Sequence, residues 1–184
     1  MTLSLEVRTI IDGALDTAIR NGLNWSPREV PADMSIGETE EYDPGSYLTR
    51  WLPTPSRVSP SEIREVSESL GIVITDQYAS VLQYKHFMDM AVGDMKFFPH
   101  PSAGWQRKLV DHALNGHPRR LLADRGYIPF ARRDDWGLYC FHTGGDLIDG
   151  EYRIFSWDHD DPTAFIGVAS DLFTAMAQCH ARKS

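Results

Sequence analysis

Three short segments with strand character follow one another closely in the second half of the chain. They read GYIPFA (126–131), GLYCFHT (137–143) and EYRIFSW (151–157), and each is rich in aromatic and β-branched residues. The connections between them are too short for a helical crossover, so neighbouring strands must pair antiparallel. Asp149-Gly150 is a typical turn signal between the last two strands. This part of the sequence therefore predicts an antiparallel sheet.

Helical patterns lie on both sides of these strands. The residues SPSE (59–62) carry a capping hydroxyl on Ser59, a proline at the first helical position and a glutamate three residues after the cap. Together these groups satisfy free backbone N–H groups at a helix start, and the cap alone is worth about 1 kcal/mol. Gly71 is a typical helix end. The sequence therefore predicts a helix over residues 59–71.

Apolar residues at helical spacing predict further helices. These cover about residues 5–21, a segment from Thr75, about 102–114, and a C-terminal segment capped by Ser170. One more strand is expected in VGDMKFFPH (92–100). Helices, then adjacent strands, then a helix are typical of the α+β class. The predicted fold is an antiparallel sheet of about four to six strands flanked by helices.

Residues 23–58 break the helical rhythm. They contain five prolines and the acidic run ETEEYD (38–43), so this stretch is either an ordered wrap or a mobile segment. A chain of 184 residues most simply forms one domain. We expect an N-terminal helix with a proline-rich extension over residues 1–58 and an α+β domain over 59–184, packed as one compact unit.

Composition excludes several classes of protein. An apolar fraction of 42% and a charged fraction of 24% are ordinary for a globular protein, and no apolar run reaches the length of a membrane span. The first residues contain acids and lack the basic start of a signal peptide, so they indicate a helix. Cys140 and Cys179 form no disulfide framework or zinc signature, which fits a reducing compartment and predicts a cytoplasmic protein.

Net charge bears on the choice of partner. The value of −8 disfavours nucleic acid, whose recognition needs a basic surface. It is compatible with a basic protein partner, because complementary charge steers the encounter of two proteins. We therefore expect a protein partner and neither nucleic acid nor membrane.

The segment RIFSWDHDD (153–161) is the most chemically distinctive part of the chain. Carboxylates and imidazole are ligands for divalent metals, which makes Asp158, His159 and Asp160 a candidate metal site. Consecutive residues on a turn point in different directions, however, and the spacing does not match a calcium-binding loop. The alternative is a strand that ends at Trp157 and continues into a polar turn. The sequence favours this alternative, and we expect no bound metal.

No catalytic constellation stands out. Cys140 with His142 and Cys179 with His180 are conceivable catalytic pairs, but a third, orienting residue is lacking and buried free cysteine is common. The chain is therefore interpreted as a binding module without a cofactor. The other histidines of the second half are expected at the surface or in caps; they are His86, His100, His112 and His117.

Blocks of this sequence, taken in order, resemble the SUKH superfamily, which includes fungal cell-wall assembly regulators and many bacterial immunity proteins. The resemblance covers about residues 59–178. The asparagine-glycine turn that usually follows the family's second helix is missing, and residues 1–58 have no counterpart. The blocks are SPSEI (59–63) with the helix pair that it opens, GYIPFA with DWGLYC (126–140), RIFSWDHD (153–160) and the closing helix (169–176).

The resemblance implies an α+β fold without enzymatic activity. Bacterial members are often immunity proteins that bind and neutralise toxins, commonly nucleases. On this sequence the resemblance implies tight binding of a cognate toxin, which charge complementarity predicts to be basic. Charge, and not the family motif, selects the acidic residues as candidates. The candidate partner-binding residues are Trp157, Asp158, His159, Asp160 and Asp161, together with Glu38, Glu40 and Glu41.

Two alternative functions stay open. A cytoplasmic adaptor or regulator, of the kind found among the fungal relatives, would have several moderate partners and no toxin. A metal-dependent hydrolase would use Asp158, His159 and Asp160 around a bound ion. The sequence favours the immunity protein over the adaptor, and both over the hydrolase.

Overall fold

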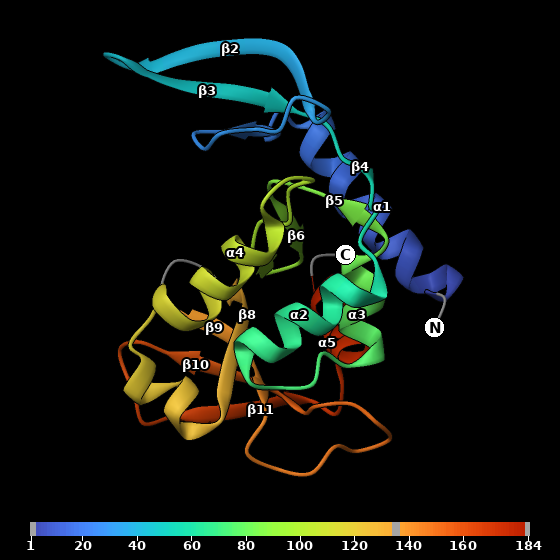
Figure 1. Cartoon of the computed structure of the whole chain (residues 1–184), viewed down its shortest axis with the longest axis vertical. Coiled ribbons are helices and arrows are strands. Elements are labelled where there is room, and N and C mark those ends of the chain that lie inside the picture. The colour runs from blue at the N-terminus through green and yellow to red at the C-terminus, as the bar shows by residue number, and fades with distance from the viewer. Residues whose placement is uncertain (1–2, 134–136, 183–184) are drawn as a thin grey trace.

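The computed structural model describes residues 3–133 and 137–182, and it has the predicted α+β class. Asp135 and Trp136, from the second block that resembles the SUKH superfamily, lie outside the described residues. The main sheet is antiparallel with strand order β11-β10-β9-β8-β7-β6, and helices surround it (Figure 1). Its strands are β6 (Met90–Val92), β7 (Met95–Phe97), β8 (Tyr127–Arg133), β9 (Gly137–His142), β10 (Ile154–Asp158) and β11 (Phe165–Ala169).

The helices occupy most of the predicted positions. None of those in the described part of the chain combines the length and the apolar character needed to cross a membrane. They are α1 (Leu5–Arg20), α2 (Pro60–Leu70), α3 (Asp76–Leu82), α4 (Trp105–Val110), a π-helix η1 (Asp111–Asn115), two 3₁₀ turns η2 (Arg119–Leu121) and η3 (Ala123–Arg125), and α5 (Leu172–Ala181).

The predicted capping box of α2 is confirmed. The Ser59 hydroxyl oxygen accepts from the backbone N–H of Glu62 at 3.3 Å, and the Glu62 carboxylate accepts from the backbone N–H of Ser59 at 2.9 Å. The backbone hydrogen bond from Ser59 favours the charged carboxylate, so the pKa of Glu62 is lowered. Gly71 ends the helix in the left-handed conformation, with φ of 69°.

One hydrophobic core joins the N-terminal helix to the sheet. Val7, Ile11 and Leu15 on α1 belong to the same cluster of buried residues as the central strands, and α1 lies against β6 and α5. Both cysteines, Cys140 on β9 and Cys179 on α5, are fully buried. Their assignment to the core is therefore confirmed.

The segment predicted as one strand over 92–100 contains the end of β6, the turn of a hairpin and the second strand β7. Strands β6 and β7 are joined at Gly93, whose φ of 63° reverses the chain. The short apolar stretches on both sides of this turn resemble one strand in the sequence, because a single glycine is the sole sign of the reversal. The predicted strand is therefore present as β7, but it is shorter than 92–100 and a chain reversal at Gly93 precedes it.

Other boundaries also differ from the prediction. The helix expected from about Ser102 begins at Trp105 and changes to a π-helix at Asp111. The cap of α5 is Asp171, whose carboxylate accepts from the N–H of Thr174, and not Ser170. Strand β11 was not predicted, because its residues are half exposed and follow no clear alternation.

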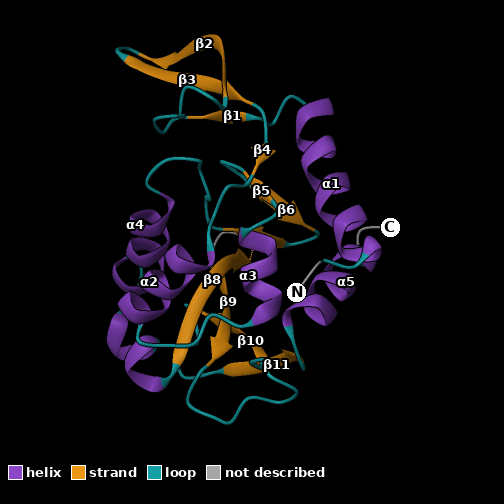
Figure 2. Ribbon diagram, turned by 45° about the vertical axis from the view of Figure 1, so that its right-hand side comes forward, coloured by secondary structure: helices purple, strands orange, loops and turns teal. Residues whose placement is uncertain are grey.

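Residues 23–58 are ordered around a second small sheet. Its strands are β1 (Trp25–Ser26), β2 (Ser35–Asp43) and β3 (Ser46–Trp51), in the order β1-β3-β2. A third sheet pairs β4 (Thr54–Pro55) with β5 (Lys85–His86). The β2–β3 hairpin stands away from the main sheet at one end of the long axis (Figures 1 and 2), while the fully buried Trp51 fixes its base to the core.

The turn at Gly93 provides a test of this packing. A Cβ atom at this position would lie 2.0 Å from the carbonyl oxygen of Cys179 in α5. We expect Gly93→Ala to lower the free energy of unfolding by more than about 3 kcal/mol, because the clash adds to the cost of a left-handed alanine. The matched control is Gly45→Ala, where φ is also positive and no atom lies within 4 Å of the new Cβ.

For Gly45→Ala the expected loss is about 1 kcal/mol. Urea unfolding followed by circular dichroism measures both values. Equal losses in the two variants would mean that α5 does not pack against this turn as described.

Candidate functional site

The acidic turn after β10, residues 158–161, is held together by its own carboxylates. Asp158 accepts from the Arg133 guanidinium at 3.1 Å and from the backbone N–H of Asp160 at 3.0 Å. Asp161 accepts from the hydroxyl of Thr163 at 2.8 Å. These bonds leave the carboxylates at the surface, but they also give Asp158 and Asp161 a structural role in shaping the turn.

Trp157 has a different role from the rest of the candidate set. Its side chain is buried, and its indole N–H donates to the carbonyl oxygen of Pro162 at 3.1 Å. On β10 it lies directly opposite Leu138 of β9. The side chain therefore anchors the turn to the sheet and is not exposed to a partner.

The candidate metal ligands do come together. Ligand atoms of Asp158, His159 and Asp160 lie within 4.8 Å of one another. The Nδ1 atom of His159 is 3.0 Å from the Asp160 carboxylate, and both side chains are exposed. A cation here would compete with Arg133 for Asp158 and with water for the other two, so this geometry favours a polar turn over a metal centre.

The cysteines do not have the properties of nucleophiles. Burial raises the pKa of the Cys140 thiol far above its ordinary value, and it raises the pKa of Cys179 to about 11. The Cys179 thiol donates to the Tyr139 hydroxyl oxygen at 3.6 Å. Because a thiolate is the reactive species, neither of the conceivable Cys–His pairs has an activated cysteine.

The second group of candidates lies on the β2–β3 hairpin. Glu38 pairs with Arg50 across the two strands at 2.8 Å, and Glu41 accepts from the backbone N–H of Gly45 at 2.9 Å. Among the described residues, the Glu40 carboxylate has no hydrogen-bond or ion-pair partner. From Ile36 to the end of the strand, every residue of β2 is exposed. The hairpin thus presents carboxylates to solvent on an edge strand.

The two acidic groups lie at opposite ends of the molecule. Strand β2 is at one end of the long axis, and β10 and β11 are at the other in both views (Figures 1 and 2). No pattern in the sequence indicates this separation. The candidate residues therefore form two distinct surfaces and not one continuous site.

Two of the histidines expected at the surface are buried. His86 and His100 have side-chain rings whose centroids are 4.7 Å apart, and both residues belong to the interior. The Nε2 atom of His100 lies 2.7 Å from the carbonyl oxygen of Leu82, so it donates, and Nδ1 carries the lone pair. Among the described atoms, this Nδ1 has no partner. Burial lowers the pKa of His100 to about 3 and also lowers that of His86.

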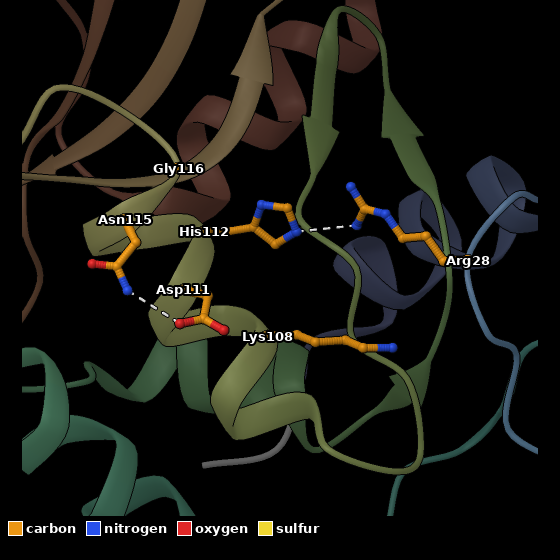
Figure 3. A pocket seen from close by; sticks show the side chains of 6 residues that line it. All are labelled: Arg28, Lys108, Asp111, His112, Asn115 and Gly116. Atoms are coloured by element: carbon orange, nitrogen blue, oxygen red, sulfur yellow. Dashed lines mark hydrogen bonds between the residues drawn. The ribbon is translucent and has the colours of Figure 1, made fainter.

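A third feature combines distant parts of the chain. Arg28, from the segment after β1, donates to Nε2 of His112 on η1 at 3.0 Å, and the two residues line a hollow (Figure 3). The sequence placed His112 among isolated surface histidines. Arg28 and His112 are 84 residues apart in the sequence. No local sequence pattern could have predicted their contact.

Comparison with known proteins adds no assignment. No model of a protein family matches this sequence, and no curated protein matches it. Inferences about function therefore rest on the geometry described above and on the resemblance of the sequence blocks.

The buried histidines predict a pH dependence of stability. Unfolded histidine has a pKa of about 6.5, whereas the folded value for His100 is lowered. The unfolded chain then binds more protons as the pH falls below about 6.5. Stability is full above that pH and is lost as the pH falls towards the folded pKa. His100 alone should contribute a loss of about 1 kcal/mol between pH 7.5 and about pH 5.5.

The variant His100→Gln isolates this effect. Its amide N–H can still donate to the carbonyl of Leu82, but it does not titrate. Urea unfolding at a series of pH values should show a flatter decline for the variant than for the wild type. Parallel declines would exclude His100 as a source of the acid sensitivity.

Proposed function

We propose that this chain is a SUKH-superfamily immunity protein that neutralises a basic toxin by direct, non-catalytic binding. The order of the sequence blocks supports the family, and the α+β fold is compatible with it. The observation that carries the functional proposal is the acidic, solvent-exposed edge strand β2. Its carboxylates offer a complementary surface to a protein that is rich in lysine and arginine.

The hairpin has further properties of a recognition surface. Tyr42 and Tyr47 are each 56% exposed, and tyrosine is enriched at the energetic centres of protein interfaces. Register places Glu41 directly opposite Tyr47, so a carboxylate and an aromatic ring lie on the same face. A partner could gain charge pairing and aromatic burial at once.

Glu40 is what favours the hairpin over the turn after β10, because Glu38 and Glu41 are bonded within the hairpin as Asp158 and Asp161 are within the turn. In the turn, Asp158 already neutralises Arg133, and Asp161 bonds with Thr163. A partner would have to break or share these bonds. On the hairpin, the carboxylate of Glu40 has no such bond among the described residues, so it can pair with a partner without an internal loss.

The proposal predicts which carboxylates matter for binding. Affinity capture from a lysate of the source organism should return one dominant basic partner, and purified chain should neutralise its toxicity at equal molar amounts. Glu38→Gln/Glu40→Gln/Glu41→Gln should weaken the affinity by about tenfold or more, mainly through slower association, and reduce its salt dependence. Surface plasmon resonance at several salt concentrations measures both effects.

The matched control is Asp158→Asn/Asp160→Asn/Asp161→Asn, which removes the same number of charges at the opposite end of the molecule. This variant should keep the wild-type affinity as long as it remains folded. If the control loses affinity and the hairpin variant does not, the turn is the binding surface. Several moderate partners without a toxin would instead support the adaptor.

A further inference from the structure

A hollow of about 410 Å³ lies between η1 and the segment that follows β1. Figure 3 shows Arg28 and Lys108 extending towards each other from different elements, with His112 between the guanidinium and the helix. This location is separate from the acidic hairpin and from the turn after β10. The lining residues are Arg28, Lys108, Asp111, His112, Asn115 and Gly116.

Among the described residues, neither cation of this hollow forms an ion pair, although Arg28 contributes to the electrostatic environment of Asp89, with which it lines a separate hollow. No carboxylate of the described residues lies within 4 Å of the charged groups of Arg28 or Lys108. Asp111, the acid in the lining, accepts instead from the Asn115 amide at 3.1 Å. In a protein whose net charge is −8, two cations without ion pairs at one hollow indicate a place for an external anion.

Arg28 is held in position. Its backbone N–H donates to the Ser26 hydroxyl at 3.1 Å, and its side chain donates to Nε2 of His112 at 3.0 Å. The His112 ring is in turn stacked on Phe98, with ring centroids 4.9 Å apart. A guanidinium has five N–H donors, and the bond to His112 uses one of them. The others remain for a ligand.

The electrostatic environment of His112 agrees with a cationic hollow. Burial, followed by the charges of Arg28, Arg132 and His117, lowers the pKa of His112 to about 4, against the opposite influence of Asp111. The imidazole therefore stays neutral near pH 7, which lets Nε2 accept from Arg28. Three cationic or protonatable neighbours outweigh one carboxylate at this ring.

The backbone is also unusual at this position. Helix α4 changes to the π-helix η1 at Asp111, and η1 carries Asp111, His112 and Asn115 into the lining. Single π-helical turns are rare and occur frequently at functional sites.

We propose that this hollow binds a phosphate group through Arg28 and Lys108. A guanidinium offers a forked set of donors that matches phosphate oxygens, and an ammonium adds a second charge. The volume exceeds that of a single phosphate, so the group can be carried by a small organic molecule. This site does not depend on toxin binding, because it uses none of the hairpin carboxylates.

The test uses the full chain and inorganic phosphate at neutral pH. Phosphate replaces chloride at constant ionic strength while the ring resonances of His112 and the side-chain Nε–H of Arg28 are followed by NMR. Both signals should move along a saturating curve. Lys108→Gln and Arg28→Gln should each weaken this binding by about tenfold, the effect of losing one charge-assisted hydrogen bond.

Arg107→Gln is the matched control, because this exposed cation lies next in sequence on α4 and does not line the hollow. It should bind phosphate as the wild type does. The proposal is overturned if phosphate acts no differently from chloride, or if all three variants bind alike. A parallel titration with ribose 5-phosphate and with ribose distinguishes the two sources: tighter binding of ribose 5-phosphate indicates a phosphorylated small molecule, and equal binding indicates the free anion.

Discussion

Strand β9 is buried on both of its faces, and the rest of the fold follows from this constraint. Leu138, Tyr139, Cys140 and Phe141 are all inaccessible to solvent. Successive residues of a strand point to opposite sides, so the sheet needs a covering layer on each side. A strand that is buried on both faces is not compatible with a two-layer fold in which one face of the sheet is exposed to solvent.

The two covering layers come from different parts of the chain. On one face, Tyr78 of α3 contacts Phe141, with ring centroids 5.0 Å apart, and Cys179 of α5 bonds to Tyr139. On the other face, Leu138 and Trp157 lie next to the segment that contains His117 and Pro118, and these four residues line one hollow. Burial of β9 thus determines where α5 and the segment after η1 must lie, and the turn after β10 is anchored by the same packing.

Features encoded by neighbouring residues were the ones that the sequence could predict. The Ser59–Glu62 capping box, the three adjacent antiparallel strands and the core location of Cys140 depend on local pattern or simple burial preference. The β2–β3 hairpin was missed because its exposed, acidic strand has no apolar alternation. Tertiary contacts alone decide that His86 and His100 are buried, since nothing in their neighbourhood distinguishes them from surface histidines.

The candidate sites show the same limit. Sequence could identify acidic residues, but not whether each carboxylate is already bonded. Asp158 and Glu40 look equivalent in the sequence, yet one neutralises Arg133 and the other has no partner among the described residues. The Arg28–His112 bond likewise joins the N-terminal extension to η1, and no local pattern encodes that approach.

The acidic hairpin and the cations Arg28 and Lys108 lie in different places because of how the N-terminal extension is anchored. Trp51 and the buried face of α1 hold both ends of the stretch that contains Arg28 and the hairpin. The hairpin therefore presents its acids away from the body, while Arg28 is kept against η1 beside Lys108 (Figure 3). Under the proposed function, a basic partner would be attracted to the first surface and repelled by the second. Repulsion at the wrong site contributes to specificity as much as attraction at the right one, so this separation restricts the orientations in which a basic protein can approach.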